Sequence, residues 1–140
     1  MQMRDDLSLS AFYRRLSGTS SASLGQRSVS DGVTTGLSMC YVTVPNEEVA
    51  TNLSDKLVES KLAACVNVIP GIKSTYVWQG KVNRDPELQL IIKTRNSLRA
   101  ELIKFVKENH PYEVPEIICT DIAAGSPDYL KWILDNTKSN

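Results

Sequence analysis

The residues with the most reactive side chains are three cysteines and a single histidine: Cys40, Cys65, Cys119 and His110. Thiolate and imidazole are ligands that suit zinc and copper, and the softer Cu(I) favours the thiolate. Cys65 and His110 are therefore the candidate metal ligands, although two ligands do not complete a site. The competing interpretation is structural, because a buried free cysteine usually behaves as a small apolar residue.

The same residues give little support to catalysis. A Cys65–His110 pair has the composition of an activated nucleophile, but the sequence marks no third group to orient the histidine and no oxyanion hole. Its isolated glycines form no glycine-rich phosphate loop. The carboxylates of Asp85-Pro86-Glu87 fall in a predicted turn before a strand, where such groups are usually solvated. We therefore expect a protein that is not an enzyme.

Composition limits the number of domains and the kinds of partner. A chain of 140 residues has the size of one domain, and its 16 Lys and Arg balance 16 Asp and Glu. Without net charge there is no general attraction for phosphate backbones or anionic lipid, so we expect neither nucleic acid nor a membrane surface as a partner. No apolar run approaches about 20 residues, the length that spans a bilayer.

The spacing of the cysteines bears on the cellular compartment. They lie far apart, form no CxxC pair and are odd in number. This pattern argues against a disulfide framework and favours a reducing compartment. We therefore expect a cytoplasmic protein.

The first 37 residues differ from the rest of the chain. They are rich in Ser, Gly and Thr, and their apolar residues show no sustained period. We expect a disordered tail over residues 1–37 and a folded domain over residues 38–140. Four arginines among many serines also resemble a mitochondrial presequence, which makes mitochondrial targeting the alternative. Asp5 and Asp6 argue against it, because such presequences are poor in acidic residues.

The folded part contains several stretches with the pattern of strands. β-Branched and apolar runs predict strands over residues 39–44, 63–69, 72–78, 87–94 and 114–123. Gln79-Gly80 predicts the turn of a hairpin that returns through Lys81 and Val82. Pro70-Gly71 and residues 83–86 are expected to interrupt the strands on either side of that turn.

Apolar residues at helical spacing predict three helices between and after these strands. The first is capped by Asn46, and the second covers residues 97–109 and is ended by Pro111. The third is short and begins at Ser126, with Pro127 at its first position, where a missing N–H has no consequence.

The predicted order is β-α-β-β-α-β with an added C-terminal helix, which is typical of an α+β, ferredoxin-like sandwich. In that fold both main helices cover one face of the sheet. The opposite face then carries a mixture of polar and apolar side chains: Cys65, Asn67, Ile69, Glu87, Gln89, Ile91 and Lys93. Such a face is too apolar for open water and too polar for a dry core, so we expect further copies of the chain to cover it.

Five segments of the chain, in the same order, resemble the CutA (divalent-cation tolerance) family over about 100 residues from Met39 onward. They are Leu62-Ala-Ala-Cys65-Val-Asn67, Tyr76-x-Trp78-x-Gly80-Lys81, Lys93-Thr94, His110-Pro-Tyr-Glu-Val-Pro-Glu-Ile117 and Tyr129-Leu-x-Trp132. The resemblance implies a ferredoxin-like homotrimer with its sheets facing inward and its edge hairpins clasping the neighbouring copies. This architecture is similar to that of PII signalling proteins.

The resemblance also implies a function in tolerance or homeostasis of divalent cations, copper above all. The alternative is a PII-like sensor of a small ligand, or a scaffold for a protein partner, since animal members are associated with the anchoring of acetylcholinesterase. Bacterial members discussed as copper binders have further Cys and His residues, and the matching positions here are Val42 and Phe105. A trimer could still bring three copies of one ligand together at its axis.

Four residues of the family motifs suggest a pocket between subunits: Trp78, Lys93, Tyr112 and Glu116. A lysine with aromatic walls suits a small anionic ligand. The simpler interpretation is packing, in which Lys93 and Glu116 form an ion pair between subunits and the two aromatic side chains fill the interface.

Overall fold

The strands and helices of this chain follow the predicted order. The computed structural model describes residues 34–139, so most of the predicted N-terminal tail lies outside the described residues. The elements are β1 (Leu37–Val44), α2 (Glu47–Glu59), β2 (Cys65–Trp78), β3 (Lys81–Arg95), α3 (Arg99–Asn109), β4 (Ile117–Asp121) and α4 (Pro127–Asp135). None of the helices in this range is long and apolar enough to cross a membrane.

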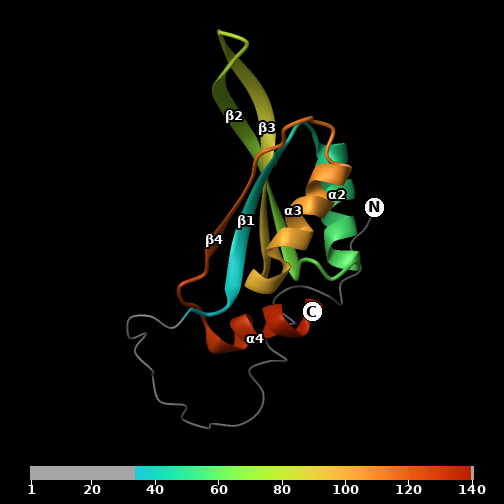
Figure 1. Cartoon of the computed structure of the whole chain (residues 1–140), viewed down its shortest axis with the longest axis vertical. Helices are drawn as coiled ribbons and strands as arrows, with labels where there is room; N and C mark the ends of the chain where they lie inside the picture. The colour runs from blue at the N-terminus through green and yellow to red at the C-terminus, as the bar shows by residue number, and fades with distance from the viewer. Residues whose placement is uncertain (1–33, 140) are drawn as a thin grey trace, which may run out of the picture. The chain divides into compact units, whose positions relative to one another are not determined.

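The four strands form one antiparallel sheet in the order β2-β3-β1-β4. Helices α2 and α3 lie together on one side of it (Figure 1). Alternate residues of β1 and β3, among them Val42, Leu90 and Ile92, are fully buried against these helices. Helix α4 packs at one end of the sheet, where Ile133 joins Leu37 in a second small cluster.

The predicted helix starts are present. The side chain of Asn46 accepts a hydrogen bond from the backbone N–H of Val49 at 2.9 Å, which satisfies one of the free donors at the start of α2. Ser126 caps α4 in the same way, with Pro127 next to it. Helix α3 differs slightly, because residues 96–98 form a 3-10 turn before it.

The predicted interruption at residues 83–86 is wrong, and the one at Pro70-Gly71 is present only as an irregular pairing within a continuous strand. β2 and β3 run for 14 and 15 residues, and Gln79-Gly80 forms the predicted turn with positive φ angles of 49° and 75°. A register shift between Ile69 and Ile72 absorbs Pro70-Gly71 as a bulge. Pro86 is tolerated because β1 pairs with β3 only from Leu88 onward, so this part of β3 has a free edge where no N–H is needed.

The last strand is shorter than predicted, since it covers residues 117–121 and not 114–123. At this end of β1 the carbonyl oxygen of Thr43 binds the ring of His110, and Pro115 has no N–H to donate. The ladder with β1 therefore begins at Ile117, which pairs with Val42. Residues 111–116 are left as a loop beside the hairpin.

The expectation that the cysteines form no disulfide is also wrong. Cys40 and Cys119 are opposite each other in the β1–β4 register and are joined by a disulfide, with their Cα atoms 4.0 Å apart. Cys65 is free. Sequence spacing did not reveal this pair because the partners are 79 residues apart and meet only through strand pairing. The argument from the cysteines for a reducing compartment therefore loses its basis.

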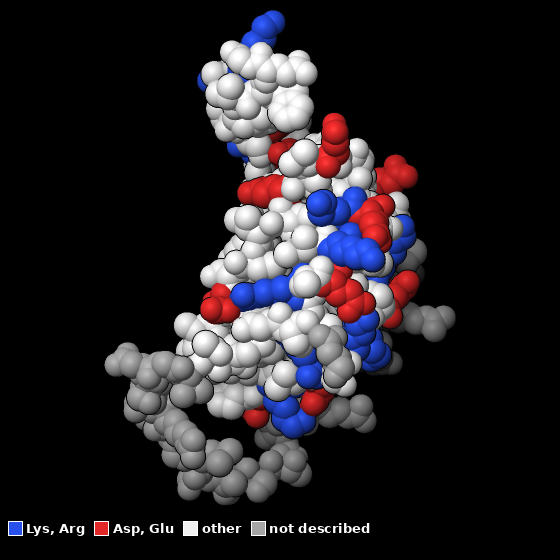
Figure 2. All heavy atoms as spheres, viewed as in Figure 1, with Lys and Arg blue, Asp and Glu red and all other residues white. Residues whose placement is uncertain are grey.

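The sheet face opposite α2 and α3 has the predicted mixed character. The register places Cys65 beside Lys93, Asn67 beside Ile91, and Ile69 beside Gln89, so these side chains share one face. Ile118 of β4 adds a side chain that is 56% exposed. Charged side chains gather over the helices, whereas the strand side of the same view is largely uncharged (Figure 2). We call the face of the sheet opposite α2 and α3, which carries Cys65, Asn67, Ile69, Gln89, Ile91 and Lys93, the open sheet face.

Candidate functional site

A cleft of about 700 Å³ lies between the β2–β3 hairpin and the loop of residues 111–116. Three aromatic side chains line it: Tyr76, Trp78 and Tyr112. Four carboxylates also line it, Asp85 and Glu87 from β3 and Glu113 and Glu116 from the loop. The long hairpin extends beyond the helices (Figure 1), which is why its outer half is free to form one wall of the cleft.

Three of the four predicted pocket residues line this cleft, namely Trp78, Tyr112 and Glu116. Lys93 does not, because it lies further along β3 on the open sheet face. There its Nζ atom is 3.9 Å from the Sγ atom of Cys65. The ion pairs between described residues of a single copy do not include one between Lys93 and Glu116. The predicted pair between subunits stays a prediction.

Glu87 is the most buried carboxylate of the cleft, with 8% of its surface exposed. The sequence placed Glu87 at the start of a strand but predicted a solvated carboxylate there, and the second of these expectations is wrong because Glu87 is buried within β3. The hydroxyl group of Tyr112 donates a hydrogen bond to Glu87 Oε2 at 3.2 Å. Burial, followed by the charge of Glu87 and this hydrogen bond, raises the pKa of Tyr112 to about 12.

A second tyrosine–carboxylate pair lies on the hairpin. The hydroxyl group of Tyr76 in β2 donates a hydrogen bond to Asp85 in β3. This hydrogen bond is the main reason why the pKa of Tyr76 is raised above its ordinary value, because an ionised tyrosine could no longer donate to Asp85. Both tyrosines therefore act as neutral donors that hold a carboxylate in place.

His110 positions one wall of the cleft. Its Nδ1 atom accepts a hydrogen bond from the backbone N–H of Tyr112 at 3.1 Å, so its Nε2 atom carries the proton and donates to the Thr43 carbonyl at 2.8 Å. The ring centroids of His110 and Tyr112 are 4.8 Å apart. With both ring nitrogens bonded to the backbone, the imidazole ties the loop to the end of β1.

The candidate metal ligands Cys65 and His110 are not brought together within one copy. Cys65 pairs with Lys93, which pairs with Met39 on β1, whereas His110 binds the carbonyl of Thr43. Met39 and Thr43 are four residues apart on β1, or about 13 Å along the strand. Within residues 34–139, no group of three or more His, Cys, Asp or Glu side chains is arranged to hold a metal ion.

Sequence reasoning missed Tyr76, Asp85 and Glu87 as partners in this cleft. The signal was available for the first two, because a hairpin turn at Gln79-Gly80 pairs Tyr76 with Asn83 and Ser74 with Asp85. Tyr76 and Asp85 are then diagonal neighbours on one face of the hairpin. No local pattern indicated that Tyr112 would cover Glu87, since that contact depends on the path of the loop.

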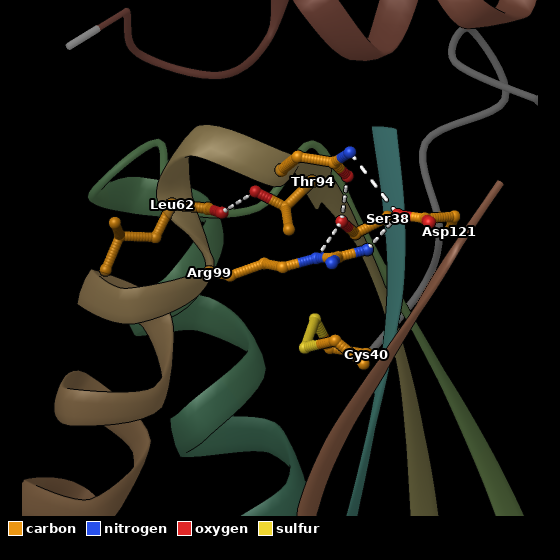
Figure 3. Close-up of a disulfide and its surroundings, with 8 residues drawn as sticks. Ser38, Cys40, Leu62, Thr94, Arg99 and Asp121 are labelled. Carbon is orange, nitrogen blue, oxygen red and sulfur yellow. Dashed lines mark hydrogen bonds and ion pairs between the residues drawn. A yellow bond between two sulfur atoms is a disulfide. The ribbon is translucent and has the colours of Figure 1, made fainter. Parts of the chain in front are cut away.

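A polar network lies next to the disulfide (Figure 3). Arg99 at the start of α3 donates through Nε to the hydroxyl oxygen of the fully buried Ser38 at 2.6 Å, and its Nη2 atom lies 2.5 Å from Asp121 Oδ1. Ser38 and Asp121 are a register pair of β1 and β4, two residues away from the pair of cysteines. Arg99 and the disulfide therefore hold the edge strand β4 at neighbouring points.

Comparison with known proteins gives a consistent result. Residues 38–136 match the family described as CutA1 divalent ion tolerance protein. The chain is 47% identical to "Protein CutA 1, chloroplastic" of Oryza sativa subsp. japonica over 134 residues, which is 96% of this chain and 75% of that protein. It is 52% identical over 99 residues to "Protein CutA, chloroplastic" of Arabidopsis thaliana, covering 71% of this chain and 54% of that protein.

A bacterial relative and a solved structure extend the similarity. The "Divalent-cation tolerance protein CutA" of Thermus thermophilus is 50% identical over 96 residues, covering 69% of this chain and 93% of that protein. The crystal structure of CutA1 from Oryza sativa superposes with a TM-score of 0.74 at 48% identity, covering 76% of this chain and 98% of that one.

Proposed function

The chain belongs to the CutA family of divalent-ion tolerance proteins, and we propose that it acts in divalent-cation tolerance as a non-catalytic homotrimer. One observation carries the cation role: the match to a family described by divalent-ion tolerance covers residues 38–136, nearly the whole described fold. A bacterial relative that is named for this role is 50% identical to the chain. Cys65 and His110 do not form a metal site together within one copy, because they lie apart.

The proposal of a trimer follows from the architecture. A sheet order of β2-β3-β1-β4 with both main helices on one face is typical of the ferredoxin-like fold. The open sheet face combines Ile69, Ile91 and Ile118 with polar neighbours, a composition that suits burial between subunits. Val77, Trp78 and Val82 of the hairpin are also more than half exposed, which supports hairpins that contact neighbouring copies.

We propose no enzymatic activity. A cysteine nucleophile would need a base within hydrogen-bond reach, and His110 is the sole histidine of the chain. Its two ring nitrogens are bonded to backbone groups of Thr43 and Tyr112, so it has no free nitrogen to offer Cys65. This arrangement supports a binding or scaffolding role.

Copper is the cation we propose, but the donors within one copy do not fit a copper site. The thiol of Cys65 is the softest available donor. Because it lies on the open sheet face, the Cys65 thiols of several copies would come close together on assembly. A direct metal site therefore has to be shared between copies. Cys65 is then the residue on which metal uptake depends.

The test combines a cellular and a molecular measurement. A bacterial strain that lacks its own homologue should grow at higher copper concentrations when it expresses this chain. Native mass spectrometry with added Cu(I) and Zn(II) should show a trimer that takes up a fixed number of ions, and Cys65→Ser should abolish the uptake. A strain that gains no copper tolerance from the chain would contradict the proposed role.

The cleft favours a second candidate function, a PII-like sensor or a scaffold for a protein partner. A concave site of about 700 Å³ with aromatic walls has the size and character of a small-molecule site. In this case Lys93→Ala would leave ligand binding unchanged, because Lys93 does not line the cleft, whereas changes at Tyr112 or Glu116 would weaken it. A partner should then be captured without added metal.

We also propose that the N-terminal segment directs the protein to an organelle. Two plant relatives are named chloroplastic, and the match to the rice protein leaves only about six of the 140 residues uncovered, so it includes most of the segment before residue 38. The abundance of serine and arginine in this segment suits a transit peptide. Import into isolated chloroplasts with loss of the segment would support plastid targeting over the cytoplasm and over mitochondria.

A further inference from the structure

We propose that the Cys40–Cys119 disulfide is a redox switch: a dithiol reductant opens it through Cys119 and so releases the edge strand β4 from β1. Both cysteine side chains pack into the core on the side of the sheet that α2 and α3 cover. Assembly through the open sheet face leaves that side uncovered. The inference goes beyond the proposed role in metal tolerance and does not depend on it, because the proposed metal ligand is Cys65.

The two sulfur atoms of the disulfide differ in their access to solvent. Cys40 is fully buried, whereas Cys119 is only partly buried. Thiol–disulfide exchange begins when a thiolate attacks one sulfur of the bond, and access decides which sulfur is attacked. In the described sheet β4 is an edge strand, so a reductant can reach Cys119 without passing another strand. The attack should therefore fall on Cys119 and release Cys40.

The reaction transfers two electrons from the dithiol to the protein. A thiolate of the reductant attacks the Sγ atom of Cys119, the bond between the two protein sulfurs breaks, and Cys40 leaves as a thiolate that takes up a proton. The second thiol of the reductant then loses its proton and attacks the reductant sulfur of the mixed disulfide. This step releases Cys119 as a thiol and leaves the reductant as a disulfide. Arg99 lies next to the disulfide (Figure 3), and a guanidinium group favours the thiolate form of a nearby cysteine.

The third cysteine does not interfere within one copy. Cys65 lies on β2, and β3 separates β2 from β1, so about 10 Å lies between the strands of Cys65 and Cys40. Cys65 pairs with Lys93, whereas Cys40 pairs with the next residue along β3 on the other side, Ile92. Successive residues of a strand point to opposite faces, so the two thiols lie on opposite sides of the sheet. Reduction therefore gives a Cys40–Cys119 dithiol that an oxidant can close again.

Most of the fold does not depend on the disulfide. The core cluster is made mainly by β1, β3, α2 and α3, with Leu53, Leu90 and Leu102 among its fully or almost fully buried members. β4 has only five residues, and in the described sheet it pairs with β1 alone. Segments with few contacts open at the lowest free energy. Loss of the disulfide should therefore loosen β4 and leave the other elements folded.

The backbone ladder of β4 supplies the signal that reports its release. The N–H of Ile122, just after β4, donates to the Leu37 carbonyl at 2.9 Å. Hydrogen-bonded pairs alternate along an antiparallel ladder, so the N–H groups of Thr120 and Ile118 also point towards β1. Exchange of these two amide protons with solvent therefore measures whether β4 is attached.

Ile118 connects the switch with assembly. Its side chain is 56% exposed on the open sheet face and lies beside Tyr41 of β1, which in turn lies beside Ile91 of β3. Release of β4 removes one end of this row of side chains, so reduction should also weaken the association of the copies. This last step rests on the proposed trimer, whereas the release of β4 does not.

The first experiment identifies the sulfur that is attacked. The native full-length protein is treated briefly with reduced glutathione, quenched with acid, digested and mapped by mass spectrometry. Glutathione should be found on Cys119 in at least tenfold excess over Cys40. Glutathione mainly on Cys40, or a reaction that occurs only in denaturant, overturns the proposal.

The second experiment measures the release of β4 by hydrogen exchange and NMR, with and without dithiothreitol. Reduction should speed the exchange of the Ile118 and Thr120 amides at least tenfold and change that of Leu90 in β3 less than twofold. Cys65→Ser is the matched control and should respond as the wild type does. Cys40→Ala/Cys119→Ala should show the fast exchange without reductant, and the reduced wild type gives the same test if that variant does not fold.

Two results of the exchange experiment would overturn the switch. Unchanged exchange in β4 after complete reduction would show that the disulfide does not control the strand. Equal loss of protection in β3 would show that the disulfide supports the whole fold. Native mass spectrometry of the same samples records the assembly. A wild type that is not a trimer in either redox state overturns the link to assembly, and the exchange of β4 still decides the switch.

Discussion

Cys40 of β1 and Cys119 of the adjacent strand β4 are register partners and form a disulfide. This disulfide closes a loop between residues that are 79 positions apart in the sequence. Cys40 is fully buried, and Cys119 packs against the same core. In the chain-entropy account, a disulfide stabilises the folded state by restricting the unfolded chain, and a loop of this length corresponds to about 4 kcal/mol.

The double variant Cys40→Ala/Cys119→Ala should therefore lower the free energy of unfolding by about 4 kcal/mol. Denaturant unfolding at one fixed protein concentration, with and without dithiothreitol, measures this change. The reductant should shift the wild type towards the variant and leave the variant unaffected. Cys65→Ala is the control and should show the wild-type response to reductant. Three reactive thiols in the native, unreduced protein would contradict the disulfide.

Arg99 gives a second prediction for the same edge strand. Arg99→Ala should cost about 1–2 kcal/mol, because it removes a hydrogen bond to the fully buried Ser38. Asp121→Asn should cost less than about 0.5 kcal/mol, because Asp121 is half exposed and its ion pair is screened by solvent. Thermal unfolding of both variants measures the difference. Equal losses would show that the ion pair, and not the hydrogen bond to Ser38, holds this end of β4.

Tyr112 predicts how stability changes at alkaline pH. Its pKa is raised to about 12 in the folded protein against about 10 in an unfolded chain, so the folded state retains a proton that the unfolded state loses. The stabilisation is complete below pH 10 and disappears as the pH rises from about 10 to 12. Tyr112→Phe should remove this part of the decline. Absorbance titration of tyrosinate should show one fewer late-titrating group in the variant, and an unchanged titration curve would contradict the assignment.

The sequence predicted the element order and the composition of the open sheet face because both follow from periodicity within short segments. Asn46 and Ser126 were identifiable as helix caps for the same reason. The disulfide and the Tyr112–Glu87 contact join residues that are distant in sequence, so no local pattern contained them. The continuity of β3 through Pro86 depended on a free strand edge, which is a property of the assembled sheet.

The candidate site was predictable only in part. Trp78, Tyr112 and Glu116 could be selected from motifs, but their negative surroundings could not, because Lys93 was assigned to the same pocket. Residues 93 and 87 are six positions apart on β3, which places them about 20 Å apart along the strand. The sign of the charge in the cleft therefore depended on where β3 passes the loop of residues 111–116.

Ile91 provides the test of assembly. It lies in the middle of the open sheet face, beside Tyr41 of β1 and Asn67 of β2. If further copies cover this face, Ile91→Asp places a carboxylate from each copy in the interface, and burying such charges without partners costs several kcal/mol for each ion. We expect the variant to be monomeric in size-exclusion chromatography with light scattering, under conditions in which the wild type is a trimer.

The matched control for Ile91→Asp is Val58→Asp, because Val58 is an exposed apolar residue on α2, on the opposite side of the sheet. It introduces the same charge, and it should leave the assembly intact. If Ile91→Asp stays trimeric while its fold is unchanged by circular dichroism, the inward-facing sheet is wrong. The exposed residues Val77, Trp78 and Val82 of the hairpin would then be the surface on which the copies associate.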